Sequence, residues 1–130
     1  MARPAPLARL LALAAVAAFA VACGADQPTG SPTPVPSGIV PVNAREFKFE
    51  PATLTVAAGT VTFAVRNTGN IEHEFEIFKG DSVVDEIEGL VPGLTKELTV
   101  DLEPGEYTYV CKLAGHEEQG MKGTLTVTGG

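Results

Sequence analysis

Histidine, cysteine and methionine are scarce in this chain. It holds two of each, and one of the two methionines is Met1. Residues that ligate metals or act as general bases are therefore few, and a site that uses both histidines leaves none for a second centre. Nothing else in the chain resembles a catalytic base or a substrate pocket, so we do not expect an enzyme.

Long apolar segments are also few. One uninterrupted apolar run covers residues 10–22, behind Arg3 and Arg9. It is shorter than the about 20 residues that a membrane-spanning helix needs, and it suits the apolar region of a secretory signal. A buried helix is the alternative, but the run lies at the extreme N-terminus behind two arginines. We therefore predict a signal peptide over residues 1–22.

Cys23 follows this run directly. Residues 20–23 resemble a bacterial lipobox, in which the cysteine becomes the lipidated first residue of the mature protein, although Ala20 stands where a larger aliphatic residue is usual. Ordinary cleavage after Ala22 is the alternative, because Ala20 and Ala22 fit that rule. A stray thiol outside the cell is a liability, so we predict lipidation. The protein is then exported, to the outer face of the cell membrane or the periplasm, with a lipid as its only membrane contact.

Residues 23–38 are rich in proline, serine, threonine and glycine and carry few apolar side chains. Such a segment cannot offset its ordering entropy and acts as a tether. The remaining residues, 39–130, are enough for one domain with one core, which we expect to be monomeric. Without Arg3 and Arg9 the chain has seven basic and 16 acidic residues, a net charge of −9. A domain of this charge is not expected to bind nucleic acid.

Alternation of apolar and polar residues dominates this domain. Period-two patterns separated by short turns predict an all-β sandwich or barrel. The turns are predicted at residues 57–59, 67–70, 92–93 and 104–105, and residues 79–94 are the least regular stretch. The alternating apolar positions are Phe47, Phe49, Leu54, Val56, Val61, Phe63, Val65, Phe75, Ile77, Leu98, Val100, Leu102, Leu125 and Val127.

Residues 107–127 read as a strand, a loop and a second strand. Cys111 ends the first strand, His116 lies in the loop and Met121 opens the second strand. A thiolate, an imidazole and a thioether from one loop suit copper, and two histidines, one cysteine and a weak axial methionine form a blue-copper site. His73 is the other histidine. Parity places His73, Cys111 and Met121 on inward rows at strand ends, so convergence is possible.

Each of these residues has an ordinary alternative role. Cys111 alone could be a small buried hydrophobe, Met121 a core filler, His73 a satisfied core histidine and His116 a surface residue. Their joint occurrence favours a metal site. Thiolate and thioether together favour copper over zinc.

On these residues the domain resembles the cupredoxins, the blue-copper family of plastocyanin and azurin. The resemblance covers most of residues 39–130 and is strongest in 67–78 and 107–127. It implies a two-sheet Greek-key β-sandwich with one type 1 copper bound by His73, Cys111, His116 and Met121. It also implies an electron route through the surface edge of His116. The loop spacing equals neither plastocyanin's nor azurin's, and Glu74 replaces the asparagine that often follows the first histidine.

The expected function is single-electron transfer between redox partners outside the cytoplasm. Copper delivery or storage on the same fold, and a metal-free adhesion or scaffold domain, are the alternatives. The residue counts leave no histidine for a multicopper oxidase centre and no second loop cysteine for a dinuclear purple-copper site. Four carboxylates near the histidines either steer a redox partner with a basic docking face or only serve solubility; they are Glu72, Glu74, Glu117 and Glu118.

Overall fold

The structure, a computed structural model, describes residues 38–130. The predicted signal peptide, Cys23 and the tether up to residue 37 lie outside this range. Residues 38–130 form strands and no helix, so no helix there is long and apolar enough to cross a membrane. The strands are β1 (Ile39–Arg45), β2 (Lys48–Glu50), β3 (Thr53–Ala57), β4 (Gly59–Asn67), β5 (His73–Lys79), β6 (Ser82–Leu90), β7 (Thr95–Leu102), β8 (Gly105–Val110) and β9 (Lys122–Thr128).

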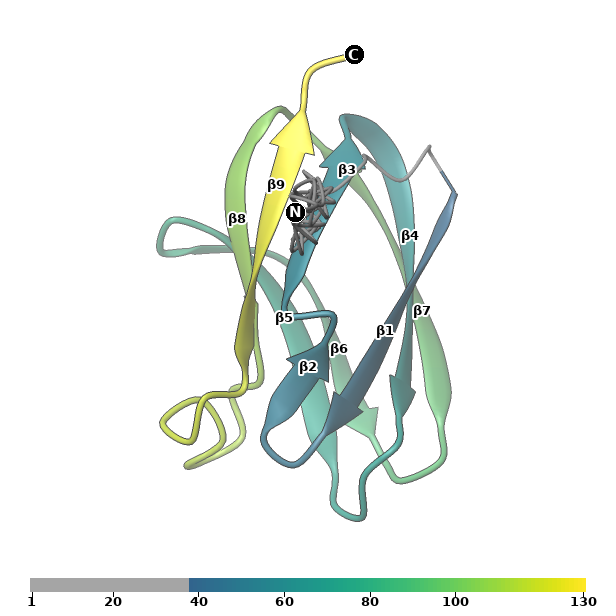
Figure 1. Cartoon of the computed structure of the whole chain (residues 1–130), viewed down its shortest axis with the longest axis vertical. Coiled ribbons are helices and arrows are strands. Elements are labelled where there is room, and N and C mark those ends of the chain that lie inside the picture. Colours follow the sequence, from purple (N-terminus) through teal and green to yellow (C-terminus); the bar gives the residue numbers. More distant parts are fainter. Residues whose placement is uncertain (1–37) are drawn as a thin grey trace, which may run out of the picture.

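Two sheets pack face to face (Figure 1). One has the order β2-β1-β4-β7 and the other the order β3-β9-β8-β5-β6. Both sheets are mixed, because β1 runs parallel to β4 and β3 runs parallel to β9, whereas the other pairs are antiparallel. The predicted all-β, two-sheet Greek-key β-sandwich is confirmed.

The inward rows of the two sheets form one apolar core, as the alternation predicts. Phe49 from β2 meets Phe75 and Tyr109 from the facing sheet with ring centroids 5.5 and 5.4 Å apart. The Tyr109 hydroxyl donates to the Pro51 carbonyl at 2.7 Å. Gly123 lies opposite Tyr109, and a Cβ there would meet the ring within 2.2 Å, so only glycine leaves room for this aromatic cluster.

The strand β6 is the main departure from the sequence prediction, which treats residues 79–94 as irregular. Its burial pattern shows no alternation: only Ile87 and Leu90 are fully buried. β6 is an edge strand, and its pairing with β5 shifts register twice. Such irregularities break the period of two on which the prediction depends.

Four connections meet at one end of the sandwich, the lower end in Figure 1. They are the β1–β2 turn, the β4–β5 and β6–β7 connections, and the longer loop between β8 and β9. His73 begins β5 and Cys111 follows the end of β8, so both belong to this end. We call it the site end.

Candidate metal centre

His73 and Cys111 come from neighbouring strands. Both side chains are fully buried, as their parity with inward residues predicts. β5 and β8 pair antiparallel, with Glu76 opposite Val110, so the start of β5 lies beside the residue that follows β8. Residues 43 positions apart in sequence, His73 and His116, thereby approach each other.

Backbone hydrogen bonds close the loop of residues 111–121. The Cys111 N–H donates to the Met121 carbonyl at 3.1 Å, and the Met121 N–H donates to the His116 carbonyl at 3.0 Å. The His116 N–H in turn donates to the Leu113 carbonyl at 3.0 Å. Met121 itself is fully buried directly before β9, in phase with the inward row of that strand. These bonds hold the backbones of Cys111, His116 and Met121 together.

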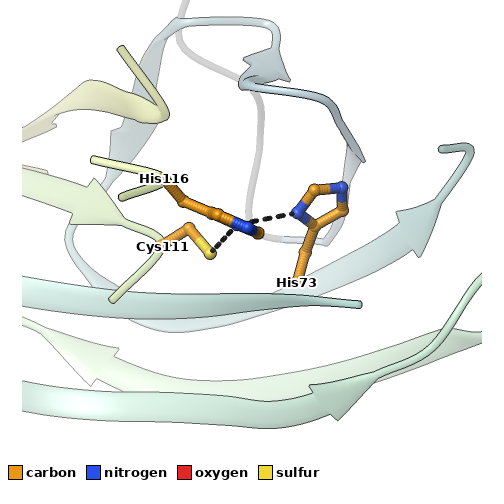
Figure 2. Close-up of side chains that lie close together, drawn as sticks. All are labelled: His73, Cys111 and His116. Carbon is orange, nitrogen blue, oxygen red and sulfur yellow. Dashed lines mark hydrogen bonds between the residues drawn. The ribbon is translucent and has the colours of Figure 1, made fainter. Parts of the chain in front are cut away.

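Three donor atoms converge at this point (Figure 2). Nδ1 of His116 lies 3.3 Å from the Cys111 sulfur and 3.4 Å from Nδ1 of His73. The three side chains present donor atoms within 4.8 Å of one another. Two donors that share one first-row ion about 2.0–2.3 Å away lie roughly 3.3–3.9 Å apart. The two distances from His116 Nδ1 therefore fit donors of a single mononuclear metal ion.

The chemistry of the donors agrees with this fit. A thiol sulfur and two imidazole nitrogens, with a buried methionine joined to the same loop, make up the donor set that copper prefers. In residues 38–130, His73, Cys111 and His116 are the only cluster of histidine, cysteine or carboxylate side chains that could hold a metal ion. Of the four predicted ligands, the structure brings three side chains together directly, and it places Met121 through its backbone.

The environment of the cluster acts on its protonation. Burial raises the pKa of the Cys111 thiol, and the Glu74 N–H, which donates to its sulfur at 3.3 Å, opposes that rise. Burial lowers the pKa of His73, and the neighbouring His116 adds to that lowering. A low pKa keeps the imidazole neutral, the form in which histidine ligates metals.

Glu74 stands where an asparagine often follows the first histidine of the family, and it still makes a hydrogen bond to the site. Glu74 binds the cysteine sulfur through its backbone N–H. The hydrogen bond therefore joins β5 to the loop of residues 111–121 whatever side chain stands at position 74. The identity of the side chain at position 74 does not predict a hydrogen bond that the backbone makes.

Asn67 is a buried residue near the site whose structural role sequence reasoning missed. Its side chain is fully buried, and its Nδ2 donates to the carbonyls of Ile71 and Leu90 at 2.7 Å each. Its Oδ1 accepts the Gly69 N–H at 2.8 Å. One amide thus ties the β4–β5 connection, which leads to His73, to the end of β6. Its position in a predicted turn was the only signal in the sequence.

The β1–β2 turn contributes two more residues that sequence reasoning did not assign. The Glu46 carboxylate accepts the N–H groups of Asn70 and Ile71, and the former lowers the pKa of Glu46 most. The ring of Phe47 packs edge-on against His116, with centroids 5.0 Å apart. His116 keeps 9% of its surface exposed, so part of this residue reaches the solvent.

Comparison with known proteins agrees with the fold. The family described as "Cupredoxin-like domain" matches residues 10–127. Auracyanin A from Chloroflexus aurantiacus, described as a "blue" copper protein, superimposes with a TM-score of 0.63 at 22% identity and covers 72% of this chain and 100% of its own. Rusticyanin from Thiobacillus ferrooxidans gives a TM-score of 0.53 at 27% identity, over 71% of this chain and 79% of its own.

A curated relative of similar sequence is larger. The protein named "Iron uptake system component EfeO" from Yersinia pestis is 43% identical over 89 residues, which is 68% of this chain but 23% of the relative. The chain therefore spans about a quarter of the length of the curated relatives it matches. The similarity concerns one part of those proteins.

We predict that Asn67→Ala destabilises the protein by roughly 2 to 3 kcal/mol, because it removes the side-chain hydrogen bond to the buried Leu90 carbonyl and those to Ile71 and Gly69. Urea unfolding of the metal-free protein measures this loss. Asn70→Ala is the matched control, since its side chain is exposed and its N–H bond to Glu46 belongs to the backbone. Equal losses in both variants would contradict the role of Asn67.

Proposed function

The chain belongs to the cupredoxin-like family, and from this premise we propose that it is a blue-copper protein that passes single electrons between redox partners. His73, Cys111, His116 and Met121 would hold one type 1 copper. The observation that carries the proposal is the buried convergence of Cys111 Sγ with Nδ1 of both histidines, 3.3 and 3.4 Å from one donor to the next. A scaffold domain has no use for such a cluster.

Copper in such a site supplies one-electron chemistry between Cu(I) and Cu(II). The protein's own residues keep the donors in one arrangement. Hydrogen bonds at Cys111, His116 and Met121 fix the loop, and the Glu74 N–H holds the sulfur. Rigid donors need little rearrangement when the charge changes, and burial keeps water out.

The surface of His116 is the proposed point of electron entry and exit. The residue retains 9% exposure, and the ring of the partly exposed Phe47 packs edge-on against it. A partner at the site end would therefore contact Phe47 together with His116. We also propose that the protein works outside the cytoplasm, with a signal peptide over residues 1–22 and a lipid on Cys23.

Copper delivery or storage is the second candidate, and one observation favours it. A relative 43% identical over 89 residues is named as a component of an iron uptake system, and this name supports a role in handling metal. Delivery requires ready release of the metal. Dialysis of the copper-loaded protein against a mild chelator separates the two functions: a carrier of electrons keeps its copper, and a delivery protein loses it.

Cys111→Ser tests the ligand assignment. We expect this variant to keep its fold and to lose the intense blue colour, because a hydroxyl cannot supply the thiolate charge transfer that a type 1 site shows. Visible absorption of the Cu(II) protein measures the colour, and urea unfolding of the metal-free protein checks the fold. An intensely blue serine variant would show that the sulfur belongs to another residue.

Met121→Leu tests the axial position. We expect the variant to retain copper and to have a higher reduction potential, because the loss of a weak axial donor disfavours Cu(II). Potentiometry of both proteins measures the shift. Complete loss of copper affinity would instead make Met121 a primary ligand.

The acidic residues at the site end favour a redox partner with a basic docking face, and the salt dependence of electron transfer tests this. We predict that electron transfer to a cytochrome with a lysine-rich face slows as salt rises from 0.01 to 0.1 M. The Debye length falls from roughly 30 to about 10 Å over this range, and steering acts mainly on association. Stopped-flow kinetics at several salt concentrations measures the slope.

The structure distinguishes among these carboxylates. Glu117 is paired with Lys112 at 2.6 Å, whereas Glu118 is exposed. Glu118→Gln should therefore flatten the salt dependence more than Glu117→Gln does. Glu103→Gln, in the connection between β7 and β8 away from the site end, is the charge-matched control. A slope that none of these changes affects would leave the acidic residues with solubility alone.

A further inference from the structure

Among the described residues of the candidate metal site, one ring nitrogen of His73 has no hydrogen-bond partner. His73 presents Nδ1 to the cluster, while its Nε2 points away from it (Figure 2). In residues 38–130, this Nε2 is the only buried side-chain nitrogen or oxygen without a hydrogen bond. A buried polar atom without a partner is costly. A histidine that ligates through one nitrogen also carries its proton on the other, and that N–H normally meets an acceptor.

The nearest charged group is the carboxylate of Glu46. Its Oε1 lies 3.9 Å from His73 Nε2, beyond hydrogen-bond length but close enough to reach it with a movement of about 1 Å. The same oxygen accepts the N–H of Ile71 at 2.9 Å and that of Asn70. One carboxylate from the four-stranded sheet therefore holds the segment that leads into β5 and faces the outer nitrogen of its first residue.

Gly69 provides an independent observation. A Cβ at this position would lie 2.5 and 2.6 Å from the two carboxylate oxygens of Glu46. Gly69 does not have a positive φ, so its backbone conformation is open to other residues. The space that a side chain at position 69 would occupy is therefore filled by the Glu46 carboxylate, the end of a flexible side chain that can shift.

We infer that Glu46 is the positioning residue of His73, which orients the imidazole by accepting its Nε2–H and anchors the preceding segment through Asn70 and Ile71. The inference rests on the proposed copper function, since it explains how one ligand is held for a metal. Glu46 itself does not ligate the metal. Its role predicts a defined tautomer for His73, with the proton on Nε2, in the metal-free protein as well.

Nitrogen NMR of ¹⁵N-histidine-labelled, metal-free protein tests this directly, because the chain has only two histidines. We expect wild-type His73 to carry its proton on Nε2, and Glu46→Ala to shift population to the Nδ1–H tautomer. Glu46→Gln should restore the wild-type tautomer in part, because its amide oxygen still accepts. Amide exchange at Asn70 and Ile71 should become about tenfold faster in Glu46→Ala, as expected for loss of a charged acceptor.

Gly69→Ala provides a second variant that leaves Glu46 in the sequence. The new methyl group displaces only the end of a flexible side chain, so the fold is retained and the tautomer shifts as in Glu46→Ala. Adding Gly69→Ala to Glu46→Ala should have no further effect, since both act on one contact. Glu72→Gln, which removes one exposed charge next to His73, should leave tautomer and exchange unchanged.

Copper loading separates the inference from the proposed function. In the diamagnetic Cu(I) protein, the His73 Nε2–H should exchange at least about tenfold faster in Glu46→Ala than in wild type. If the wild-type protein fails to form a blue site, the proposed function fails, and the metal-free measurements still decide the role of Glu46. If wild type is blue but neither Glu46→Ala nor Gly69→Ala changes the tautomer or the exchange rates, the inference is overturned and the function stands.

Discussion

The pairing of β8 with β9 is the constraint on which the site depends. These strands pair from Gly105 opposite Val127 to Val110 opposite Lys122, and the bond from Cys111 N–H to Met121 carbonyl extends the ladder by one step. A loop with both ends fixed by a sheet has little freedom left. The Met121 N–H then fixes His116 from inside the loop. Three of the four proposed ligands thus follow from one strand pair, and the fourth, His73, begins the strand next to β8.

The buried polar residues of the described domain gather at one end of the sandwich. In residues 38–130, the buried polar or charged residues are Asn67, His73 and His116, and all three belong to the site end. Burying polar groups costs free energy unless they are hydrogen-bonded. Backbone groups at this end provide hydrogen-bond partners, and the Asn67 side chain makes three hydrogen bonds to them. The remaining core is apolar and stabilises the sandwich, and His73 Nε2 is the one buried side-chain nitrogen or oxygen of residues 38–130 without a hydrogen bond.

Sequence patterns predict most of the fold and the row on which the ligands lie, because the strands are buried on one face and alternation records that directly. His73, Cys111 and Met121 are buried for the same reason as Phe75, Tyr109 and Leu125 on their strands. Strand β6 was not predicted, because apolar and polar residues do not alternate in this edge strand with its shifted register. The sequence also did not predict the contacts that three residues make near the site, namely Glu46, Phe47 and Asn67, and the reason differs. Their roles depend on which turn of one sheet meets which loop of the other, and neither spacing nor parity records contacts between sheets.

These contributions divide the site into two parts. The pairing of β8 with β9 and the Glu74 N–H bond to sulfur are backbone features, so they persist when side chains change, as they do at position 74. Glu46 and Phe47 act through side chains, on His73 and His116 respectively. A fold shared with the "blue" copper protein auracyanin A brings the donor atoms of His73, Cys111 and His116 together at one end of the sandwich. The surroundings of the two histidines, by contrast, depend on side chains, because Glu46 faces His73 and the ring of Phe47 packs against His116.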